Sequence, residues 1–423
     1  MIEAKDILPL IGIPGAKIKY VDTNGDPENT IIFLELEDKR GCCPYCHSSD
    51  IGIKDYYNAR INNTIVKHKK ITCEIRVRRY ICKRCHKTFK QEYDLANKGS
   101  SISNEVKRAI IEDLKEALTF TQIAKDHQVS LTTVVRILQT SILKQLPLKL
   151  SEVISIDEFC FKHTNNKLGK YPAVITNPLT GKIIDIIVSR WKDVLFDYFN
   201  KVKYHERFGV KYFISDMNET YRQLKRAFFH NATHIVDRFH LIKAFNDAIT
   251  SIRTRIIKQN EELTDKEYRY LKKNWKVFLK DRNDLEKIKT INKLGIVTDP
   301  TEDLDRCLKR FPDLFNAYWT KEEFRFKTRN LMLYKDAENL MYFYEKQLLN
   351  STIIELNKVG RTLRNWRGEI INGMIRNEYN HRLTNAVAES TNNQIQTLIN
   401  ICHGIPKFEN MRQRVLYINR NKK

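Results

Sequence analysis

The chain lacks the features of a membrane-spanning, secreted or fibrous protein. No uninterrupted apolar run approaches the length that spans a bilayer. The first residues carry acidic side chains and lack the basic-then-apolar layout of a secretion signal. Heptads and internal repeats are also absent, which makes a purely structural role the least favoured one. We therefore expect a cytoplasmic protein that has no membrane partner.

Acidic residues are outnumbered in this sequence. The chain has 74 Lys and Arg against 51 Asp and Glu, which gives a formal net charge of +23. Such a surplus suggests a polyanionic partner such as nucleic acid. An AT-rich genome gives a similar bias toward Lys, so charge alone does not decide the matter. At 423 residues the chain is too long for one ordinary core, and two to four domains are expected.

Cysteine is scarce except in one segment, since the whole chain has 9 cysteines. Two Cys-x-x-Cys pairs stand in that segment, Cys43 with Cys46 and Cys82 with Cys85. Clustered pairs in a cytosolic chain of this size indicate a metal site rather than disulfides. Four thiolates at two corners suit one structural Zn²⁺ with bonds of about 2.3 Å.

The exact ligand set stays open at this point. Three neighbours could replace a ligand: Cys42 in place of Cys43, and His47 or His86 in place of a sulfur. Residues 71–82 between the pairs alternate as a strand does, so we interpret residues 1–98 as a β-rich, zinc-binding domain of the zinc-ribbon type. Basic residues on its rim, among them Arg78 and Arg79, are candidate DNA contacts.

A helical pattern begins near Ser103 and contains a short helix, a turn and a second helix. Thr121 is expected to cap the first of these two helices, and the turn is expected at residues 128–130. The layout predicts a helix-turn-helix in residues 99–148, whose second helix reads the major groove. A plain helical hairpin is the alternative. The residues expected to face DNA are Ser130, Thr132, Thr133 and Arg136.

The period changes from helical to strand-like after Pro147. Three strand candidates are followed by helix, strand, helix and strand, which is the order of the RNase H-like α/β fold. We assign residues 149–240 to the first part of this core. Residues 241–380 lack strand signals and are interpreted as an all-α insertion. Residues 381–423 are interpreted as a helix returning to the core, with a C-terminal tail.

Three acidic residues are expected to meet in this fold. Asp157 lies in the first strand, Asp216 follows the fourth strand, and Glu389 lies on the returning helix. Strand alternation predicts that Glu158 points to the face opposite to Asp157. Carboxylates of this kind hold two divalent cations about 4 Å apart, which activate a nucleophile and stabilise a leaving oxygen. Any one of these acids alone would have an ordinary structural explanation.

These residues resemble those of bacterial insertion-sequence transposases of the ISL-three family, which belong to the DDE transposase group. The resemblance runs nearly end to end. It is carried by the zinc knuckles with RRYICKRCHKTF, the helix-turn-helix, Ile156–Phe159, Ser215–Met217, Asp237–His240 and Ala388–Asn393. Asn177 departs from the pattern, because many relatives are expected to carry an acid there, and this leaves an auxiliary role for that position in doubt.

The resemblance implies an RNase H-like core in which Asp157, Asp216 and Glu389 are catalytic and hold two Mg²⁺ or Mn²⁺ ions. It also implies binding to the terminal inverted repeats of a mobile element and to target DNA, followed by cleavage and strand transfer. Asp237 and His240 resemble an auxiliary pair that braces the active site or touches the scissile strand. A helix N-cap with a packed histidine is an equal alternative for them.

We therefore hypothesise a nucleoid-associated DNA transposase. Synapsis of two element ends favours a homodimer or a larger assembly on DNA. One rival is a non-catalytic zinc and helix-turn-helix regulator derived from a transposase, and another is a nuclease of the same fold that hydrolyses without joining. Trp366, or another aromatic residue of the insertion, is a candidate for stacking on an exposed base, although a buried core position is the more common role of tryptophan.

Overall fold

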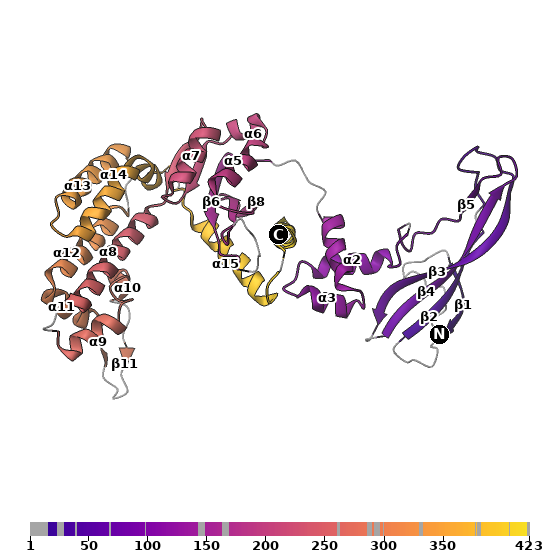
Figure 1. Cartoon of the computed structure of the whole chain (residues 1–423), viewed down its shortest axis with the longest axis horizontal. Coiled ribbons are helices and arrows are strands. Elements are labelled where there is room, and N and C mark those ends of the chain that lie inside the picture. The colour runs from indigo at the N-terminus through magenta and orange to yellow at the C-terminus, as the bar shows by residue number, and fades with distance from the viewer. Residues whose placement is uncertain are drawn as a thin grey trace. The chain divides into compact units, whose positions relative to one another are not determined.

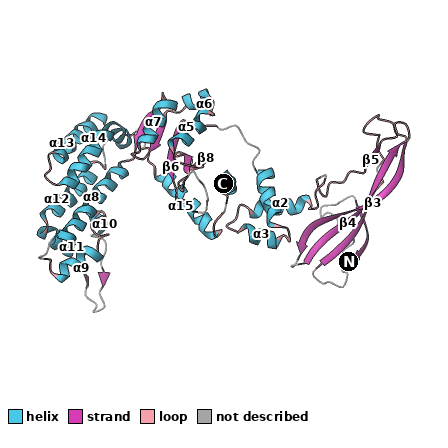
Figure 2. Ribbon diagram, viewed as in Figure 1, coloured by secondary structure: helices cyan, strands magenta, loops and turns pink. Residues whose placement is uncertain are grey.

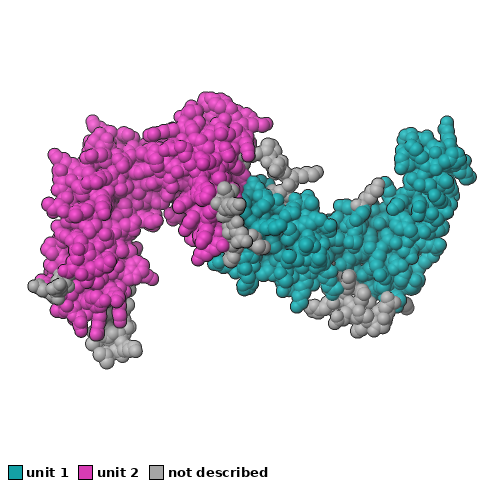
Figure 3. Space-filling model, viewed as in Figure 1, with its two compact units in different colours: residues 1–147, 395–423 teal, residues 148–394 magenta. Residues whose placement is uncertain are grey.

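The chain divides into two compact units, which we describe separately. Unit 1 comprises Met1–Pro147 with Ile395–Lys423, and unit 2 comprises Leu148–Gln394 (Figure 3). No helix among the described residues is long and apolar enough to cross a membrane. The computed structural model describes residues 16–22, 29–38, 40–66, 69–97, 99–142, 149–162, 169–259, 263–285, 290–291, 297–298, 300–329, 333–376, 378, 382–405 and 407–420.

Unit 1 begins with a five-stranded sheet, and two of its strands are long (Figure 1). The strands are β1 (Ala16–Asp22), β2 (Asn29–Leu36), β3 (Ile51–Val66), β4 (Lys69–Cys82) and β5 (Thr88–Lys90). The order is β1-β2-β4-β3, and β5 pairs with β4 beyond this path. Along β4, Ile75 and Val77 are fully buried while Arg76 between them is exposed, so one face of the strand forms the core.

Three short helices follow in unit 1: α2 (Asn104–Asp113), α3 (Phe120–Asp126) and α4 (Leu131–Ile137). The π-helix η1 (Leu138–Ile142) continues α4. The side chain of Thr119 caps α3 by accepting from the Gln122 backbone N–H, so the expectation that Thr121 is the cap was wrong. Ile123, Ala124 and Val134 form the core between these helices, as a helix-turn-helix requires.

The C-terminal helix α16 (Phe408–Arg420) packs in unit 1 against the helix-turn-helix. Arg414 is fully buried there, and its guanidinium donates to the backbone oxygens of Leu114, Glu116 and Leu118. These carbonyls lie at the end of α2 and in the loop before α3. The helix-turn-helix is therefore completed by a segment some 300 residues away along the chain.

Unit 2 is built on a second five-stranded sheet of order β10-β9-β6-β7-β8. β6, β7 and β8 are antiparallel neighbours, whereas β9 and β10 run parallel to β6. Three strands followed by helices alternating with two strands is the order predicted from the sequence, with α6 as an additional helix. The elements are β6 (Val153–Glu158), β7 (Ala173–Asn177), β8 (Lys182–Ile187), α5 (Lys192–Asn200), α6 (Tyr204–Phe208), β9 (Tyr212–Ser215), α7 (Glu219–Phe228) and β10 (Thr233–Val236).

The rest of unit 2 is a helical region, as Figure 2 shows. One short pair of strands interrupts it, β11 (Thr290–Ile291) with β12 (Val297–Thr298), and the sequence did not predict this pair. The region shares one hydrophobic core, in which Phe245, Phe324 and Met341 are fully buried. Its helices are α8 (Arg238–Gln259), α9 (Asp265–Lys273), α10 (Arg282–Leu285), α11 (Pro300–Arg310), α12 (Pro312–Lys327), α13 (Tyr334–Leu349) and α14 (Ile354–Met374).

Helix α14 returns from this region to the sheet and lies very close to β10. A Cβ atom added at Gly373 would lie 2.3 Å from the backbone oxygen of Val236, a distance that no side chain tolerates. Only glycine therefore allows the helix to approach the strand this closely. After α14 the chain enters α15 (Ala386–Ile401), which carries the last of the candidate acids.

Candidate active site and zinc site

The first two candidate acids lie at the same edge of the sheet of unit 2. Strands β6 and β9 are parallel and pair Ser155 with Ile214. Continuing that register by two residues brings Asp157 beside Asp216. Strand β10 is parallel to β9 and pairs Val236 with Ser215, so Asp237 follows at the same level. Because parallel strands end at a common edge, three aspartates from three neighbouring strands converge there.

Helix α15 is tied to this edge by two asparagines. Asn392 donates from Nδ2 to Asp157 Oδ2 at 3.0 Å and to the backbone oxygen of Glu158 at 3.2 Å. Asn385, just before the helix, accepts a hydrogen bond from the Ser155 hydroxyl through Oδ1. Asn392 is three residues after Glu389, so both side chains lie on one face of the helix. These contacts bring Glu389 to the edge that carries Asp157.

The electrostatics of the site show that these acids share one environment. Burial raises the pKa of Asp157 to about 6, and the charges of Glu158 and Glu389 raise it further. Burial also raises the pKa of Asp216 to about 7, with contributions from Glu158 and Asp157. The pKa of Glu389 is raised by burial. The groups therefore hold negative charge less readily than free carboxyls do.

One cation opposes the rise in pKa of all three acids. The charge of Lys243 lowers the pKa of Asp157, Asp216 and Glu389, although burial outweighs it. Lys243 lies on α8 three residues after His240, which places these two side chains on one face of the helix. Its spacing after His240 was a usable signal in the sequence.

The acid cluster has unused ligand atoms. Asp216 Oδ1 and Asn392 Oδ1 are buried and have no hydrogen-bond partner among the described residues. A buried carboxylate oxygen without a partner costs free energy unless a cation or water satisfies it. The donor set of carboxylate and amide oxygens is the one that Mg²⁺ and Mn²⁺ prefer. The residues thus fit a divalent cation.

Glu158 contacts other elements than Asp157 does. Its carboxylate accepts from the Tyr221 hydroxyl at 2.7 Å and pairs with Arg190. Its negative charge raises the pKa of both Asp157 and Asp216. That Glu158 and Asp157 point to opposite faces of the sheet stays a prediction.

Asp237 has both of its carboxylate oxygens in structural hydrogen bonds. Oδ1 accepts from the backbone N–H of Phe239 at the start of α8, and Oδ2 accepts from the backbone N–H of Asn385 at 3.1 Å. Asp237 therefore joins the start of α8 to the segment that begins α15. The Nε2 atom of His240 is buried and has no partner in the described part of the chain, and burial lowers the pKa of this imidazole.

Trp366 is a core residue, so the idea that it stacks on an exposed base was wrong. It is 7% exposed, and the guanidinium of Arg222 covers its ring at 3.5 Å. Arg222 also pairs with Glu369 at 2.9 Å. The neighbouring His234 is buried and donates to or accepts from the hydroxyl of Ser215, the residue before Asp216. This network supports the strand end that presents Asp216.

The second candidate site is formed by the four paired cysteines of unit 1. All four sulfurs lie within 4.8 Å of one another, with 3.6 Å between Cys43 and Cys85 and 3.6 Å between Cys46 and Cys82. Sulfurs around a tetrahedral Zn²⁺ are separated by about 3.8 Å. Backbone N–H groups, first that of Cys85, lower the pKa of the Cys82 thiol to about 6. The geometry therefore fits zinc.

The two knuckles share one local geometry, which explains the ligand set. His47 and His86 each have φ of 57°, and each donates its backbone N–H to the oxygen of the first cysteine of its pair, Cys43 or Cys82. The two histidines thus close the turns, and neither belongs to the cluster of four ligand atoms. Cys42 is exposed and also lies outside that cluster.

The residues expected to face DNA lie mainly on the surface of the helix-turn-helix. Ser130 caps α4 by accepting from the Thr133 backbone N–H at 3.2 Å, and its hydroxyl also contacts those of Thr132 and Thr133. Ser130, Thr132 and Arg136 are exposed, and Thr133 is half-buried. A usable donor surface is therefore present along the first turns of α4.

The two arginines of the zinc domain are placed differently. Arg78 is 11% exposed and donates to the backbone oxygen of Leu36 at 2.6 Å, so its guanidinium holds the sheet together. Arg79 is 39% exposed and pairs with Asp55 at 3.0 Å. Of the two, only Arg79 stays a candidate for contact with DNA.

The sheet edge with its acids and the helix-turn-helix are typical of a protein that binds and processes DNA, and comparison with known families identifies the class. Residues 154–415 match a DDE-type family model described as transposase, and residues 91–141 match one described as the helix-turn-helix domain of transposase family ISL3. The protein is a transposase with a DNA-binding helix-turn-helix. Because the first match covers more than half of the chain, the chain belongs to the ISL3 family of transposases. No curated protein in the comparison matches it.

Proposed function

We propose that unit 2 contains an RNase H-like catalytic core that cuts and joins DNA with two Mg²⁺ or Mn²⁺ ions held by Asp157, Asp216 and Glu389. The observation that carries this proposal is the convergence of Asp157 and Asp216 at neighbouring parallel strand ends, with Asn392 of α15 bonded to Asp157. The unpartnered Asp216 Oδ1 supports a cation at this point. The transposase family of the chain supports the activity.

The open arrangement of the acids is consistent with two ions. Among the described residues, the four cysteines are the only group of three or more ligands whose atoms lie within 4.8 Å of one another. The carboxylate oxygens of the three acids are therefore not gathered around one metal position. Ligands on opposite sides of two ions about 4 Å apart do not need to touch each other.

The residues of the site have separable tasks in this proposal. Asp216 and Asp157 present carboxylates from a rigid sheet, and Asn392 fixes the orientation of Asp157. The ions, when bound, activate water or a DNA 3′-hydroxyl and stabilise the leaving oxygen. Asp237 holds the starts of α8 and α15 together, so it braces the site. Lys243 offers a positive charge beside the acids, where a phosphate would lie.

We further propose that unit 1 recognises the terminal inverted repeats of the element through Ser130, Thr132, Thr133 and Arg136, with Arg79 adding a backbone contact. Exposed donors at the start of a recognition helix are suited to base edges and phosphates in the major groove. Cleavage of two ends requires two active sites, so we propose a dimer or a larger assembly on DNA. Zinc at the cysteines would then be structural.

The test is cleavage of a labelled duplex that carries the element end and its flanking DNA, in Mg²⁺ or Mn²⁺. Wild type is compared with Asp157→Asn, Asp216→Asn and Glu389→Gln, and DNA binding is measured for each. We expect cutting at the element end by wild type and a loss of about 10²–10³-fold in each variant, without loss of binding. Binding without cutting by wild type would instead favour a regulator derived from a transposase. Continued cutting by Glu389→Gln would remove Glu389 from the site.

A further inference from the structure

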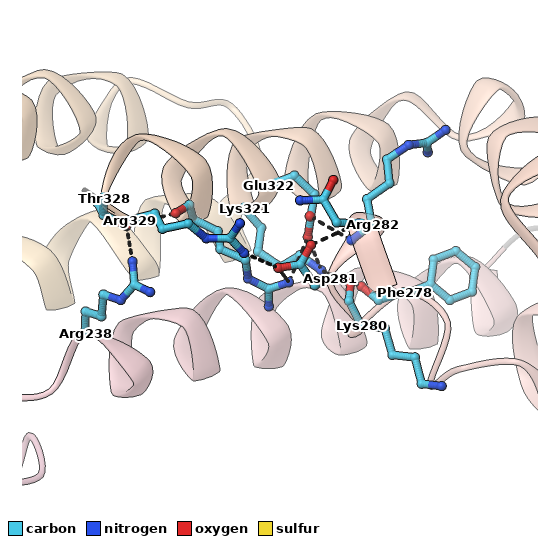
Figure 4. A network of polar contacts seen from close by, with 11 residues as sticks. Arg238, Phe278, Lys280, Asp281, Arg282, Lys321, Glu322, Thr328 and Arg329 are labelled. Carbon is cyan, nitrogen blue, oxygen red and sulfur yellow. Dashed lines mark hydrogen bonds and ion pairs between the residues drawn. The ribbon is translucent and has the colours of Figure 1, made fainter. Parts of the chain in front are cut away.

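Two groups of cations lie outside the sites described above, and they differ in how they are neutralised. In the helical region, Lys321 pairs with Glu322 at 3.0 Å and Arg329 pairs with Asp281 at 3.3 Å (Figure 4). Lys321 is fully buried and also donates to the backbone oxygen of Phe278. The cations of this group have partners within the protein and serve packing. The other group lies on the sheet of unit 1.

The long strands β3 and β4 have one covered face and one exposed face. On the covered face, Ala59 and Ile61 of β3 and Ile75 of β4 pack in the core of the sheet. The residues between them point the other way, because successive side chains of a strand alternate. We call this second surface the exposed sheet face, and it carries Tyr56, Asn58, Arg60, Glu74 and Arg76. All of these but Glu74 are exposed, so no described part of the chain covers this face.

Positive charge on the exposed sheet face is only partly neutralised. Glu74 accepts from Asn58 Nδ2 at 3.1 Å and pairs with Arg60 at 3.6 Å, and the Arg60 side chain is still 65% exposed. Arg76 forms no ion pair with any described residue, and its guanidinium lies over the Tyr56 ring at 4.2 Å. A guanidinium that stacks on a ring keeps the N–H groups at its edge free to bind an anion.

The exposed sheet face leads to the turn that precedes helix α4. Asn62, two residues after Arg60 on β3, donates from Nδ2 to the backbone oxygen of Gln128 at 3.5 Å. The Ser103 backbone N–H donates to the backbone oxygen of Asn62 at 2.8 Å, which ties β3 to the start of the helix-turn-helix. Gln128 lies two residues before Ser130, the cap of α4. Because two strand residues span about 7 Å, Arg60 lies near this contact.

We propose that the exposed sheet face binds the phosphate backbone of the DNA that α4 reads, through Arg60 and Arg76. A helix in the major groove, which is about 12 Å wide, has a phosphate backbone on each side of it. Cations that continue the surface beside the start of that helix meet one of these backbones. Such contacts fix the register of the protein on the duplex without reading bases. The choice of DNA segment rests on the proposed role of α4.

The experiment measures the affinity of the full, zinc-loaded chain for a fluorescent duplex that contains the element end, over a range of salt concentrations. Each phosphate contact adds about 0.9 to the slope of log K against log salt, so Arg76→Gln should weaken binding about eightfold at about 0.1 M salt. Its slope should fall by about one, and that of the double variant Arg60→Gln with Arg76→Gln by about two. Arg306→Gln, at an exposed arginine of α11, is the matched control and should change neither.

Two further variants separate a phosphate contact from other effects, and zinc content shows that each variant keeps the sheet. Arg76→Lys retains the charge and should keep the wild-type slope. Arg136→Gln on α4 should reduce the preference for the element end over a scrambled duplex, which Arg76→Gln should leave as in wild type.

The proposal is overturned if Arg60→Gln and Arg76→Gln both leave affinity and salt slope unchanged. It is also overturned if Arg76→Lys loses as much slope as Arg76→Gln, because the charge would then not be what matters. If Arg136→Gln keeps the full preference for the element end while the sheet variants lose slope, the proposed role of α4 fails and the phosphate contact stands.

Discussion

The zinc site and the acid site of this protein differ in how their ligands are brought together. The four cysteines come from two turns of one local design, and their sulfurs are within 4.8 Å of one another. The acids come from β6, β9 and α15, with a helical region inserted between the last two, and they form an open cluster. The first arrangement suits an ion that stays in place. The second, which we propose to hold ions beside DNA, depends on the packing of the whole of unit 2.

The largest effect should follow from removing one ligand of the four-cysteine site. Cys82→Ser removes a ligand whose thiol already has a lowered pKa, and the remaining three cannot complete a tetrahedron. Because apparent binding of structural zinc is worth about 10–16 kcal/mol, we expect loss of zinc and unfolding of the N-terminal sheet. Zinc content by mass spectrometry and limited proteolysis measure this. Cys42→Ser, at an exposed cysteine outside the cluster, should retain one zinc per chain.

The second effect is the pH dependence of stability that the buried acids cause. Without bound metal, as in the presence of a chelator, the pKa values of Asp216 and Asp157 in the folded protein are about 7 and about 6. Both lie above the value of about 3.9 for a free aspartate. Their contribution to stability is complete below about pH 4 and is lost as the pH rises through 6 and 7.

The melting temperature of wild type should therefore fall on the order of 5 °C between about pH 5 and pH 8 in a chelator. Mg²⁺ should reduce that fall, and Asp216→Asn should flatten it, as differential scanning calorimetry would show. Asp193→Asn, at an exposed aspartate of α5, should behave as wild type does. If the melting temperature of Asp216→Asn falls with pH as steeply as that of wild type, the raised pKa of Asp216 is wrong.

The third effect sharpens the role of α15. Asn392→Ala removes the hydrogen bond that orients Asp157 while leaving all three acids in place. Residues that orient a metal ligand are typically worth about 10–100-fold in activity or metal affinity, so we expect cleavage to fall by that factor. Single-turnover cleavage at saturating enzyme measures it. Asn400→Ala, at an exposed position of the same helix, should cut at the wild-type rate.

The smallest effect tests the packing that the open site requires. Gly373→Ala forces a methyl group against the backbone oxygen of Val236, which should destabilise unit 2 by about 1–3 kcal/mol. Gly368→Ala lies on the same helix and meets nothing within 4 Å, so it should be neutral or stabilise by up to about 1 kcal/mol. Urea unfolding of both variants gives the comparison, and equal stabilities would contradict the close approach of α14 to β10.

The sequence predicted what local patterns can encode. The spacing of Cys43, Cys46, Cys82 and Cys85 was enough to find the cysteine cluster whose geometry fits zinc, and the alternation of strands and helices after residue 150 gave the element order of the sheet. The transposase family was also recognised from its motifs, and the family comparison confirms it. These features depend on neighbours that are close along the chain.

The features that sequence analysis missed depend on distant contacts. Asn392 gains its role only because α15 reaches β6, and Trp366 is covered because Arg222 of α7 lies on its ring. Arg414 completes the helix-turn-helix from the far end of the chain, which no periodicity reveals. The prediction that Thr121 caps α3 was a local error, because the cap is Thr119. A threonine stands at both positions, and helical spacing alone does not distinguish them.

The most direct test of the central claim is to count the ions at the open site. Electron paramagnetic resonance of Mn²⁺ on the full chain with its element-end DNA serves this purpose, because Zn²⁺ at the cysteines is diamagnetic and gives no signal. We predict two coupled Mn²⁺ ions about 4 Å apart, both lost in Asp216→Asn. One isolated Mn²⁺ ion, or a coupled pair that persists in Asp216→Asn, would contradict a two-metal centre at Asp157, Asp216 and Glu389.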